Sequence, residues 1–201
     1  AKGTPNHAEK VMKYYSIATG DSSAEISLLE GNSGLKVVYY NQGDAAWKSI
    51  PYSTSTIGQS GCGPTSMAIC ISTLSGKKIT PRQTCQWAGS QGYYVKGAGS
   101  KHDVIPGLAK KYGVKCKGVG KNKPQIIQAL KTGKLVVAIM SAGHFTSGGH
   151  FIVLTGIKDG KITVADCGSR QRTKQTWSLD LIVDESNSSC LLYTSPSPRD
   201  L

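Results

Sequence analysis

Apolar residues recur with a helical period through the middle of this chain and then give way to short continuous runs in its last third. The helical pattern predicts helices at 62–74, 80–91, 103–112 and 124–131. The first of these takes Pro64 in its first turn and ends before Gly76, which is the usual arrangement of helix start and stop signals. The other three are each followed by a glycine as well.

Runs of β-branched and other apolar residues predict four strands, at 36–40, 135–140, 150–157 and 161–166. The last two are separated only by Lys158, Asp159 and Gly160, so we expect them to form a hairpin. Helices dominate the first part of the pattern and strands the last part. This order favours an α+β domain over a doubly wound parallel sheet.

The compact pattern occupies only part of the chain. Residues 1–34 are polar and rich in turn residues, and we interpret them as a linker or as the tail of a missing upstream module. Residues 35–189 form the predicted domain. Residues 190–201 can be written in frame as a transposase-type sequencing adapter, so we expect a translated adapter there rather than native sequence. No apolar run approaches the roughly 18 residues that a membrane span needs.

The formal net charge of +12 predicts a basic surface. Such a surface is either simply solvated or attracts polyanions, among them the anionic polymers of a bacterial cell wall. The lysines stand singly or in pairs, without a basic block or interleaved aromatic residues, so we expect no nucleic-acid partner. Setting Cys190 aside leaves an odd number of cysteines and no CxxC pair, which predicts at least one free thiol and no zinc knuckle.

Cys62 is the candidate nucleophile. A cysteine reacts as a thiolate, and the free N–H groups and dipole of a helix N-terminus favour a negative charge there. Gly61 and Gly63 allow a tight turn and a close approach of a substrate backbone, and the N–H of Cys62 could stabilise an oxyanion. The alternative for a lone cysteine is a small buried apolar residue. We expect that role for Cys70, Cys85 and Cys116.

The candidate bases are His7, His102, His144 and His150. His7 lies in the expected linker, and His102 lies at a helix start, where a solvent-facing polar role is the ordinary one. His144 and His150 flank the glycine-rich turn "GHFTSGGH", and His150 then begins a strand. A side chain in that position is well placed at the rim of a cleft, so His150 is the preferred base.

The hairpin offers a test of Asp166 as the carboxylate that orients His150. A three-residue turn at 158–160 would pair Ile152 with Asp166 and put Asp166 on the same face of the ladder as His150. A two-residue turn at 159–160 would put Asp166 on the opposite face. A Cys–His–Asp arrangement therefore predicts the longer turn. The alternative is that Asp166 is a solvated carboxylate at a strand end.

Four segments, in this order and at this separation, resemble the papain-like peptidases of cysteine peptidase family thirty-nine: "YYNQGDAAW", "SGCGPTSMA", "GGHFIVL" and "ITVAD". The resemblance covers about residues 36–185 and is closer to the broad bacterial family thirty-nine-like branch than to the leader peptidases of bacteriocin exporters. It implies a papain-like fold, in which N-terminal helices, with the cysteine at a helix start, pack on a C-terminal antiparallel sheet.

By position, the resemblance implies that Cys62 attacks the scissile carbonyl, His150 transfers the proton and Asp166 holds the imidazole in its tautomer. It also implies that a glutamine ahead of the cysteine completes the oxyanion hole. Gln42 matches that position best, and Gln59, which is nearer to Cys62, competes with it. The substrate cleft is expected to include Gly61, Gly63, His144 and Gly149.

The chain departs from the family pattern in two places. The insertion between Gln42 and Cys62 is long, and Cys167 follows Asp166 where we expect a proline. Neither departure removes a catalytic group.

The expected function is that of a cysteine endopeptidase without a metal or cofactor. We expect the protein to be secreted or associated with the cell envelope, in a bacterium or a phage-related source. Its candidate substrates are peptides, including the peptides of peptidoglycan. Three alternatives stay open: a non-catalytic binding module, an acyl or amide transferase or deamidase with the same residues, and a zinc site. The zinc site would use Cys62, His144, His150 and Cys167.

Overall fold

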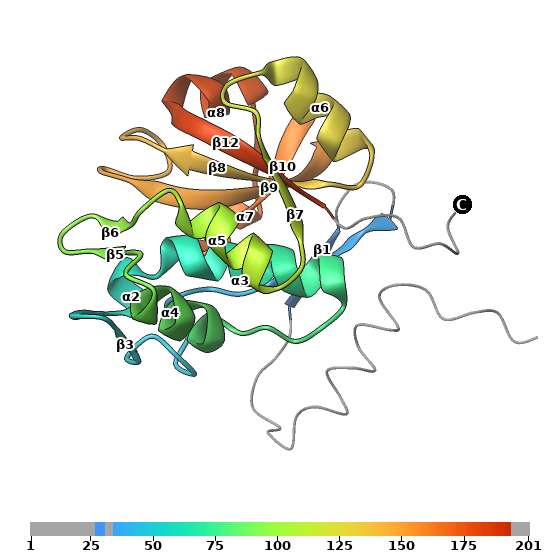
Figure 1. The fold of residues 1–201 in the computed structure, drawn as a ribbon. Helices are drawn as coiled ribbons and strands as arrows, with labels where there is room; N and C mark the ends of the chain where they lie inside the picture. The colour runs from blue at the N-terminus through green and yellow to red at the C-terminus, as the bar shows by residue number, and fades with distance from the viewer. Residues whose placement is uncertain (1–26, 31–33, 194–201) are drawn as a thin grey trace, which may run out of the picture.

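The computed structural model describes residues 27–30 and 34–193. Its centre is a six-stranded antiparallel sheet with the strand order β11-β10-β9-β8-β12-β7 (Figure 1). The strands are β7 (Lys115–Gly118), β8 (Leu135–Met140), β9 (His150–Lys158), β10 (Lys161–Ala165), β11 (Thr176–Trp177) and β12 (Ser186–Tyr193). The described residues also form three two-stranded ribbons: β1 (Ser27–Glu30) with β2 (Lys36–Tyr39), β3 (Pro51–Tyr52) with β4 (Ser55–Thr56), and β5 (Tyr94–Val95) with β6 (Gly99–Ser100).

Helices cover both faces of the sheet. Figure 1 shows α3 (Cys62–Ser75), α4 (Pro81–Ser90) and α5 (Val104–Lys111) on one side, and α6 (Lys123–Lys131) and α8 (Leu179–Glu185) on the other. The short helices α2 (Ile57–Ser60) and α7 (Arg170–Thr173) complete the described part of the chain. None of the helices in the described ranges is long and apolar enough to cross a membrane.

Strands β8 and β9 are buried on both faces, which explains their continuous apolar runs. Alternate residues such as Val137 and Val153 belong to the core beneath α3. Their neighbours, such as Val136 and Ile152, belong to a second core with α6 and α8. Each large apolar side chain buried in this way stabilises the fold by roughly 1.5–3 kcal/mol. The sheet is thereby a rigid central layer from which the site residues project.

Helix α3 is fixed along its length by buried hydroxyl groups as well as by apolar packing. Ser66 Oγ donates to the Phe151 carbonyl on β9 at 3.1 Å, and Thr73 Oγ1 accepts from the Val38 N–H on β2 at 2.9 Å. Gly76 ends the helix in the left-handed conformation, with a φ of 68°. These contacts hold the first residue of α3, Cys62, in a defined position relative to β9.

The predicted α+β class is confirmed, and the four predicted helices and four predicted strands are present with ends that differ by one or two residues. The sequence pattern did not predict β1, which lies inside the expected linker, nor β7, β12 and α8, nor the short elements β3, β4, β5, β6, β11, α2 and α7. Strands such as β7, with its "KCKG" sequence, carry too few apolar residues to show a strand period.

The hairpin between β9 and β10 differs from the turn that a Cys–His–Asp arrangement predicted. Lys158 pairs with Lys161, so the turn has the two residues Asp159 and Gly160, both with positive φ. The prediction of a three-residue turn was therefore wrong. Further along, a β-bulge lies between Thr163 and Val164, where the extra residue Thr155 is inserted on β9.

The bulge shifts the register by one residue, so that Leu154 pairs with Val164 and Val153 with Ala165. Continued by one step, this register brings Asp166 opposite Ile152, on the same face as His150. Asp166 thus lies beside His150 as expected, but because of the bulge and not because of a three-residue turn.

Residues 190–193 extend β12 and pair with β7 and β8. Leu192 is completely buried in the core beneath α3. Strand pairing uses backbone groups that every residue carries, so a native and a non-native sequence can pair in the same way. The adapter origin of residues 190–201 therefore stays a prediction. Residues 1–26, 31–33 and 194–201 lie outside the described residues.

Candidate functional site

Cys62 is the first residue of α3 and is half-buried at a cavity of about 230 Å³. The other residues that line the cavity are mostly small or polar: Gln59, Ser60, Gly97, Ala98, Gly99 and Gly149. The β5–β6 ribbon and its loop supply three of them, in a segment for which the sequence pattern predicted no role. The thiol therefore faces a narrow cleft next to free N–H groups of a helix start.

The turn that presents Cys62 requires glycine at one of its two flanking positions. The N–H of Gly61 donates to the Ile57 carbonyl where α2 meets α3, and a Cβ on Gly61 would lie 2.6 Å from that oxygen. A Cβ on Gly63 would lie 3.3 Å from the Ser100 side chain, which is a tight contact but not a clash with backbone. Gly61 is thus required by the backbone path into α3.

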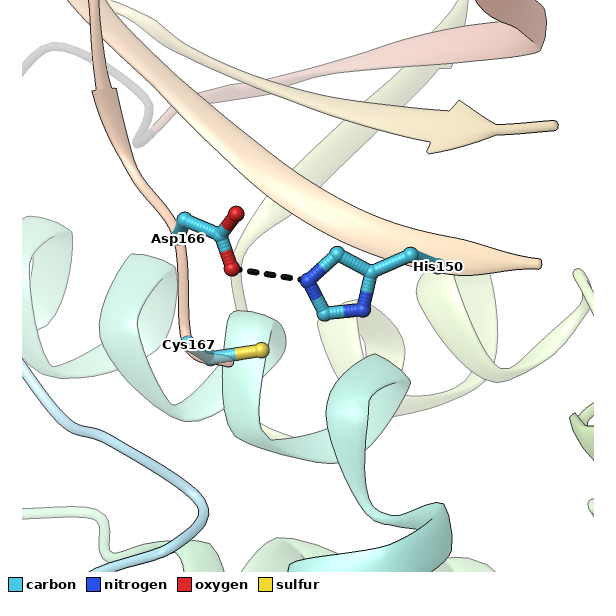
Figure 2. A group of neighbouring side chains, drawn as sticks. All are labelled: His150, Asp166 and Cys167. Atoms are coloured by element: carbon cyan, nitrogen blue, oxygen red, sulfur yellow. Dashed lines mark hydrogen bonds and ion pairs between the residues drawn. The ribbon is translucent and has the colours of Figure 1, made fainter. Parts of the chain in front are cut away.

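His150 and Asp166 form a buried pair at one end of the sheet (Figure 2). His150 begins β9 and Asp166 follows β10, and the His150 Nε2 and Asp166 Oδ1 atoms are 2.7 Å apart. The Asp166 side chain is completely buried, and His150 has only 8% of its surface exposed. With Nε2 held by the carboxylate, Nδ1 is the nitrogen left for the Cys62 thiol, which is near enough to His150 to raise its pKa.

The surroundings of His150 favour its protonated form. Burial lowers the pKa of His150, but the hydrogen bonds with Asp166 and Cys62 together raise it more strongly, so that the pKa is about 9 instead of 6.5. A histidine that carries a proton easily beside a thiol stabilises the corresponding thiolate. This is the electrostatic arrangement that a cysteine nucleophile needs.

Asp166 accepts hydrogen bonds on both carboxylate oxygens. Oδ1 accepts from the Gly168 N–H at 2.8 Å in addition to His150, and Oδ2 accepts from the Arg172 Nε–H at 2.6 Å. Burial raises the pKa of Asp166, but these partners, with His150 the strongest, bring it below the usual value. Asp166 is therefore an ionised, oriented carboxylate, and not the solvated strand-end group of the alternative interpretation.

The two candidate oxyanion glutamines have different environments. Gln42 is buried, its N–H donates to the Cys167 carbonyl at 2.8 Å, and its Nε2 donates to the Gly58 carbonyl at 2.9 Å. Gln59 is exposed and lines the cavity beside Cys62. Gln42 is thus fixed in place behind the cysteine, whereas Gln59 borders the open side of the cleft.

Cys167 lies below the pair, as Figure 2 shows. Its thiol is 3.4 Å from Gln42 Oε1 and 3.4 Å from the Cys62 carbonyl oxygen, so it connects the glutamine to the start of α3. Burial raises the pKa of Cys167 well above the usual range, and Cys62 and Asp166 nearby raise it further. Cys167 is therefore a neutral hydrogen-bond donor at this site.

Within the described residues, His150, Asp166 and Cys167 bring three potential metal-ligand atoms within 4.8 Å of one another. Both Asp166 oxygens already accept hydrogen bonds, and the guanidinium of Arg172 would face any cation bound there. The Cys167 thiol, with its raised pKa, is a poor source of thiolate. The donor set suits proton transfer better than metal binding.

His144, which the sequence analysis placed in the cleft and in the zinc alternative, has other partners in the structure. Its backbone N–H and its ring Nδ1 both contact the Glu185 carboxylate, and its ring lies edge-on to Trp177. His102, the other candidate within the described residues, lies edge-on to Phe151. Of the three, His150 is the histidine that the structure brings to Cys62.

A family model described as "Peptidase_C39 like family" matches residues 34–190 of the chain. Among curated proteins, none matches.

Solved structures of peptidases share the fold at low sequence identity. A C39-like peptidase from Bacillus anthracis has a TM-score of 0.51 at 16% identity, with 87% of this chain and 100% of that chain covered. A double glycine motif protease from an AMS/PCAT transporter, solved with a leader peptide, has a TM-score of 0.51 at 19% identity, with 86% and 100% covered. The peptidase domain of Streptococcus ComA has a TM-score of 0.50 at 15% identity, with 68% and 93% covered.

Proposed function

Because the chain belongs to the peptidase C39-like family and is a cysteine peptidase, we propose that it hydrolyses peptide bonds with Cys62 as nucleophile, His150 as base and Asp166 as the orienting carboxylate. The observation that carries this proposal is the position of His150, which bonds Asp166 through Nε2 at 2.7 Å and is near enough to Cys62 for the thiol to raise its pKa. The solved relative that holds a leader peptide supports a peptide as the substrate of this fold.

In the proposed mechanism, the Cys62 thiol transfers its proton to His150 Nδ1 and the resulting thiolate attacks the scissile carbonyl carbon. The Cys62–substrate bond forms as the carbonyl π bond becomes an oxyanion. His150 then donates the proton to the departing amine, and an acyl-enzyme remains. Water, deprotonated by His150, attacks this thioester and releases the acid together with the Cys62 thiol. Asp166 keeps the imidazole in the required tautomer throughout.

Oxyanion stabilisation is assigned to the backbone N–H of Cys62 and to a glutamine amide. Gln42 is the preferred glutamine because it is buried and held by the Cys167 and Gly58 carbonyls, so it loses little freedom on binding. The amide would have to exchange its bond to the Gly58 carbonyl for one to the oxyanion. Gln59 remains the alternative.

A mixed peptide library incubated with the protein and followed by mass spectrometry tests the proposal. We expect cleavage products with the wild-type chain and none with Cys62→Ala. Cys116→Ala is the matched control, because Cys116 is a half-buried cysteine on β7 and should cleave like the wild type. Cleavage that persists in Cys62→Ala would overturn the assignment. A mass change without cleavage would assign the same residues to acyl transfer or deamidation.

We further propose that peptides of the bacterial cell wall are a substrate, with the protein secreted or bound at the envelope. The support is electrostatic. Between Val104 and Lys158 the chain has no Asp or Glu, and besides two histidines its basic residues there are Lys110, Lys111, Lys115, Lys117, Lys121, Lys123, Lys131, Lys134 and Lys158. Most of these lysines are exposed, and exposed positive charge attracts anionic wall polymers.

Purified peptidoglycan tests the substrate separately from the activity. We expect new amino termini to appear with the wild-type chain and not with Cys62→Ala. If the peptide library is cleaved and peptidoglycan is not, the substrate proposal fails while the peptidase proposal stands.

A further inference from the structure

The Asp166 carboxylate is completely buried between two charged partners on opposite sides. His150 bonds Oδ1, and the guanidinium of Arg172 bonds Oδ2 at 2.6 Å through Nε. A carboxylate held on one oxygen alone can still rotate about its Cβ–Cγ bond. Contacts on both oxygens fix the plane of the group and therefore the direction in which Oδ1 meets the imidazole.

The local structure holds Arg172 in place. Its backbone N–H donates to Ser169 Oγ at 3.1 Å, and its carbonyl accepts from Trp177 Nε1 at 3.1 Å. The next residue, Thr173, ties the same helix to Asp166, because Thr173 Oγ1 accepts from the Asp166 N–H at 3.0 Å. Helix α7 is thus a short structural unit bonded to both the side chain and the backbone of Asp166.

We propose that Arg172 is a positioning residue of the peptidase site. Arg172 holds the Asp166 carboxylate, which orients His150, in one plane and keeps it ionised. The inference rests on the proposed function, because it assigns to Arg172 an action through Asp166 and His150 and no contact with substrate. Arg172 lies in "SRQRT", a segment without a motif, so the sequence pattern gave no reason to select it.

The other titratable groups around Asp166 do not replace this charge. Tyr39 on β2 donates its hydroxyl to the Asp166 carbonyl at 2.8 Å, and burial raises its pKa, so it is neutral. Cys167 is neutral for the reason given above. Among the groups named here, Asp166 is therefore the one whose charge changes at acid pH, because His150, with its raised pKa, stays protonated there and Arg172 is a constant cation.

Alkylation of Cys62 by iodoacetamide, measured across pH by mass spectrometry, tests the inference. When Asp166 becomes protonated, it ceases to support the imidazolium, and the thiolate is lost with it. The acid limb of the rate profile is the range in which the alkylation rate rises with pH. In Arg172→Met we expect this limb to shift to higher pH by about one unit, since an adjacent opposite charge lowers a carboxyl pKa by about that much or more. Arg172→Lys keeps the charge, so its acid limb should stay close to that of the wild type.

Arg170→Met is the matched control. Arg170 lies on the same helix and pairs with Asp44 at 2.7 Å, so its loss removes one positive charge without touching the Asp166 side chain. We expect a wild-type acid limb in this variant. If Arg172→Met fails to fold, Arg172→Gln, which is neutral but can still donate a hydrogen bond, decides: an acid limb raised by about one pH unit supports the inference, and a wild-type acid limb overturns it.

Different results would overturn the proposed function and the role of Arg172. If wild-type Cys62 reacts no faster than Cys116, and His150→Ala changes nothing, the proposed function fails. If Cys62 reacts fast and depends on His150, while a folded Arg172→Met has the wild-type acid limb, only the role of Arg172 is overturned.

Discussion

His150 Nε2 lies 2.7 Å from Asp166 Oδ1, although the turn between their strands has the length that would place the two side chains on opposite faces. The bulge at Thr155 reconciles these facts, because it shifts the register between the turn and the site by one residue. Thr155 Oγ1 and Thr163 Oγ1 lie 2.9 Å apart at this point and bridge the irregular part of the ladder. The site thus depends on a backbone irregularity that lies several residues away from it.

The first prediction concerns the ionisation of His150. NMR titration of its ring should give a pKa of about 9 in the wild-type chain, and a lower one in Asp166→Asn, which lacks the carboxylate that supports the imidazolium. A wild-type value at or below 6.5 would contradict the geometry. Cys62→Ala should lower the pKa as well, because it removes the second hydrogen bond.

The same shift predicts how stability depends on pH. The folded-state pKa of His150 is raised above the unfolded value, so its contribution to the free energy of unfolding is complete below about pH 6.5. It is then lost as the pH rises through about 9, by roughly 3 kcal/mol. Urea unfolding at intervals between pH 6 and 10 measures the loss. In His150→Gln the free energy should be flatter across this range.

The second prediction separates the two glycines beside Cys62. Gly61→Ala should slow Cys62 alkylation and lower the melting temperature, because its Cβ would meet the Ile57 carbonyl oxygen at 2.6 Å and displace the start of α3. Gly63→Ala meets side-chain atoms of Ser100 and Val104 at 3.3 Å, which can yield by a few tenths of an ångström. Its effect should be the smaller one on both measurements, and a reversed order would be inconsistent with the structure.

The third prediction distinguishes the two candidate glutamines. Gln42→Ala should reduce kcat on a cleaved peptide by about 10²–10³-fold, the usual effect of removing one oxyanion donor. Gln59→Ala should leave kcat nearly unchanged, because this exposed side chain contacts Ser55 Oγ at 3.3 Å and is not held at the cysteine. The opposite result would transfer the oxyanion role to Gln59.

The fourth prediction concerns the turn far from the cleft. Gly160 has a φ of 73°, so Gly160→Ala should cost about 1 kcal/mol of stability through backbone strain alone, as no atom lies within 4 Å of the added Cβ. Gly118→Ala is the control, since Gly118 is equally open but has no positive φ. Neither change should alter Cys62 alkylation. An equal loss of stability in both variants would argue against strain at the turn.

The elements whose signals are local could be predicted from the amino-acid sequence alone. Pro64 and Gly76 mark the ends of α3, and the apolar runs of β8 and β9 reflect burial on both faces. The sequence also determined which cysteine and histidine were candidates, because glycines beside Cys62 and before His150 are visible in the chain. Local patterns can carry this information because helix capping and side-chain period act over a few residues.

Features that depend on contacts between distant segments could not be predicted in this way. The register that brings Asp166 to His150 comes from a bulge with no sequence signal, and the partner on Oδ2 comes from a helix of four residues. The edge strand β7 and its pairing with β12 likewise leave no period in the sequence. In each case the structure is determined by the free energy of strand pairing and burial between parts of the chain that are far apart in sequence. A local sequence pattern contains no information on these contacts.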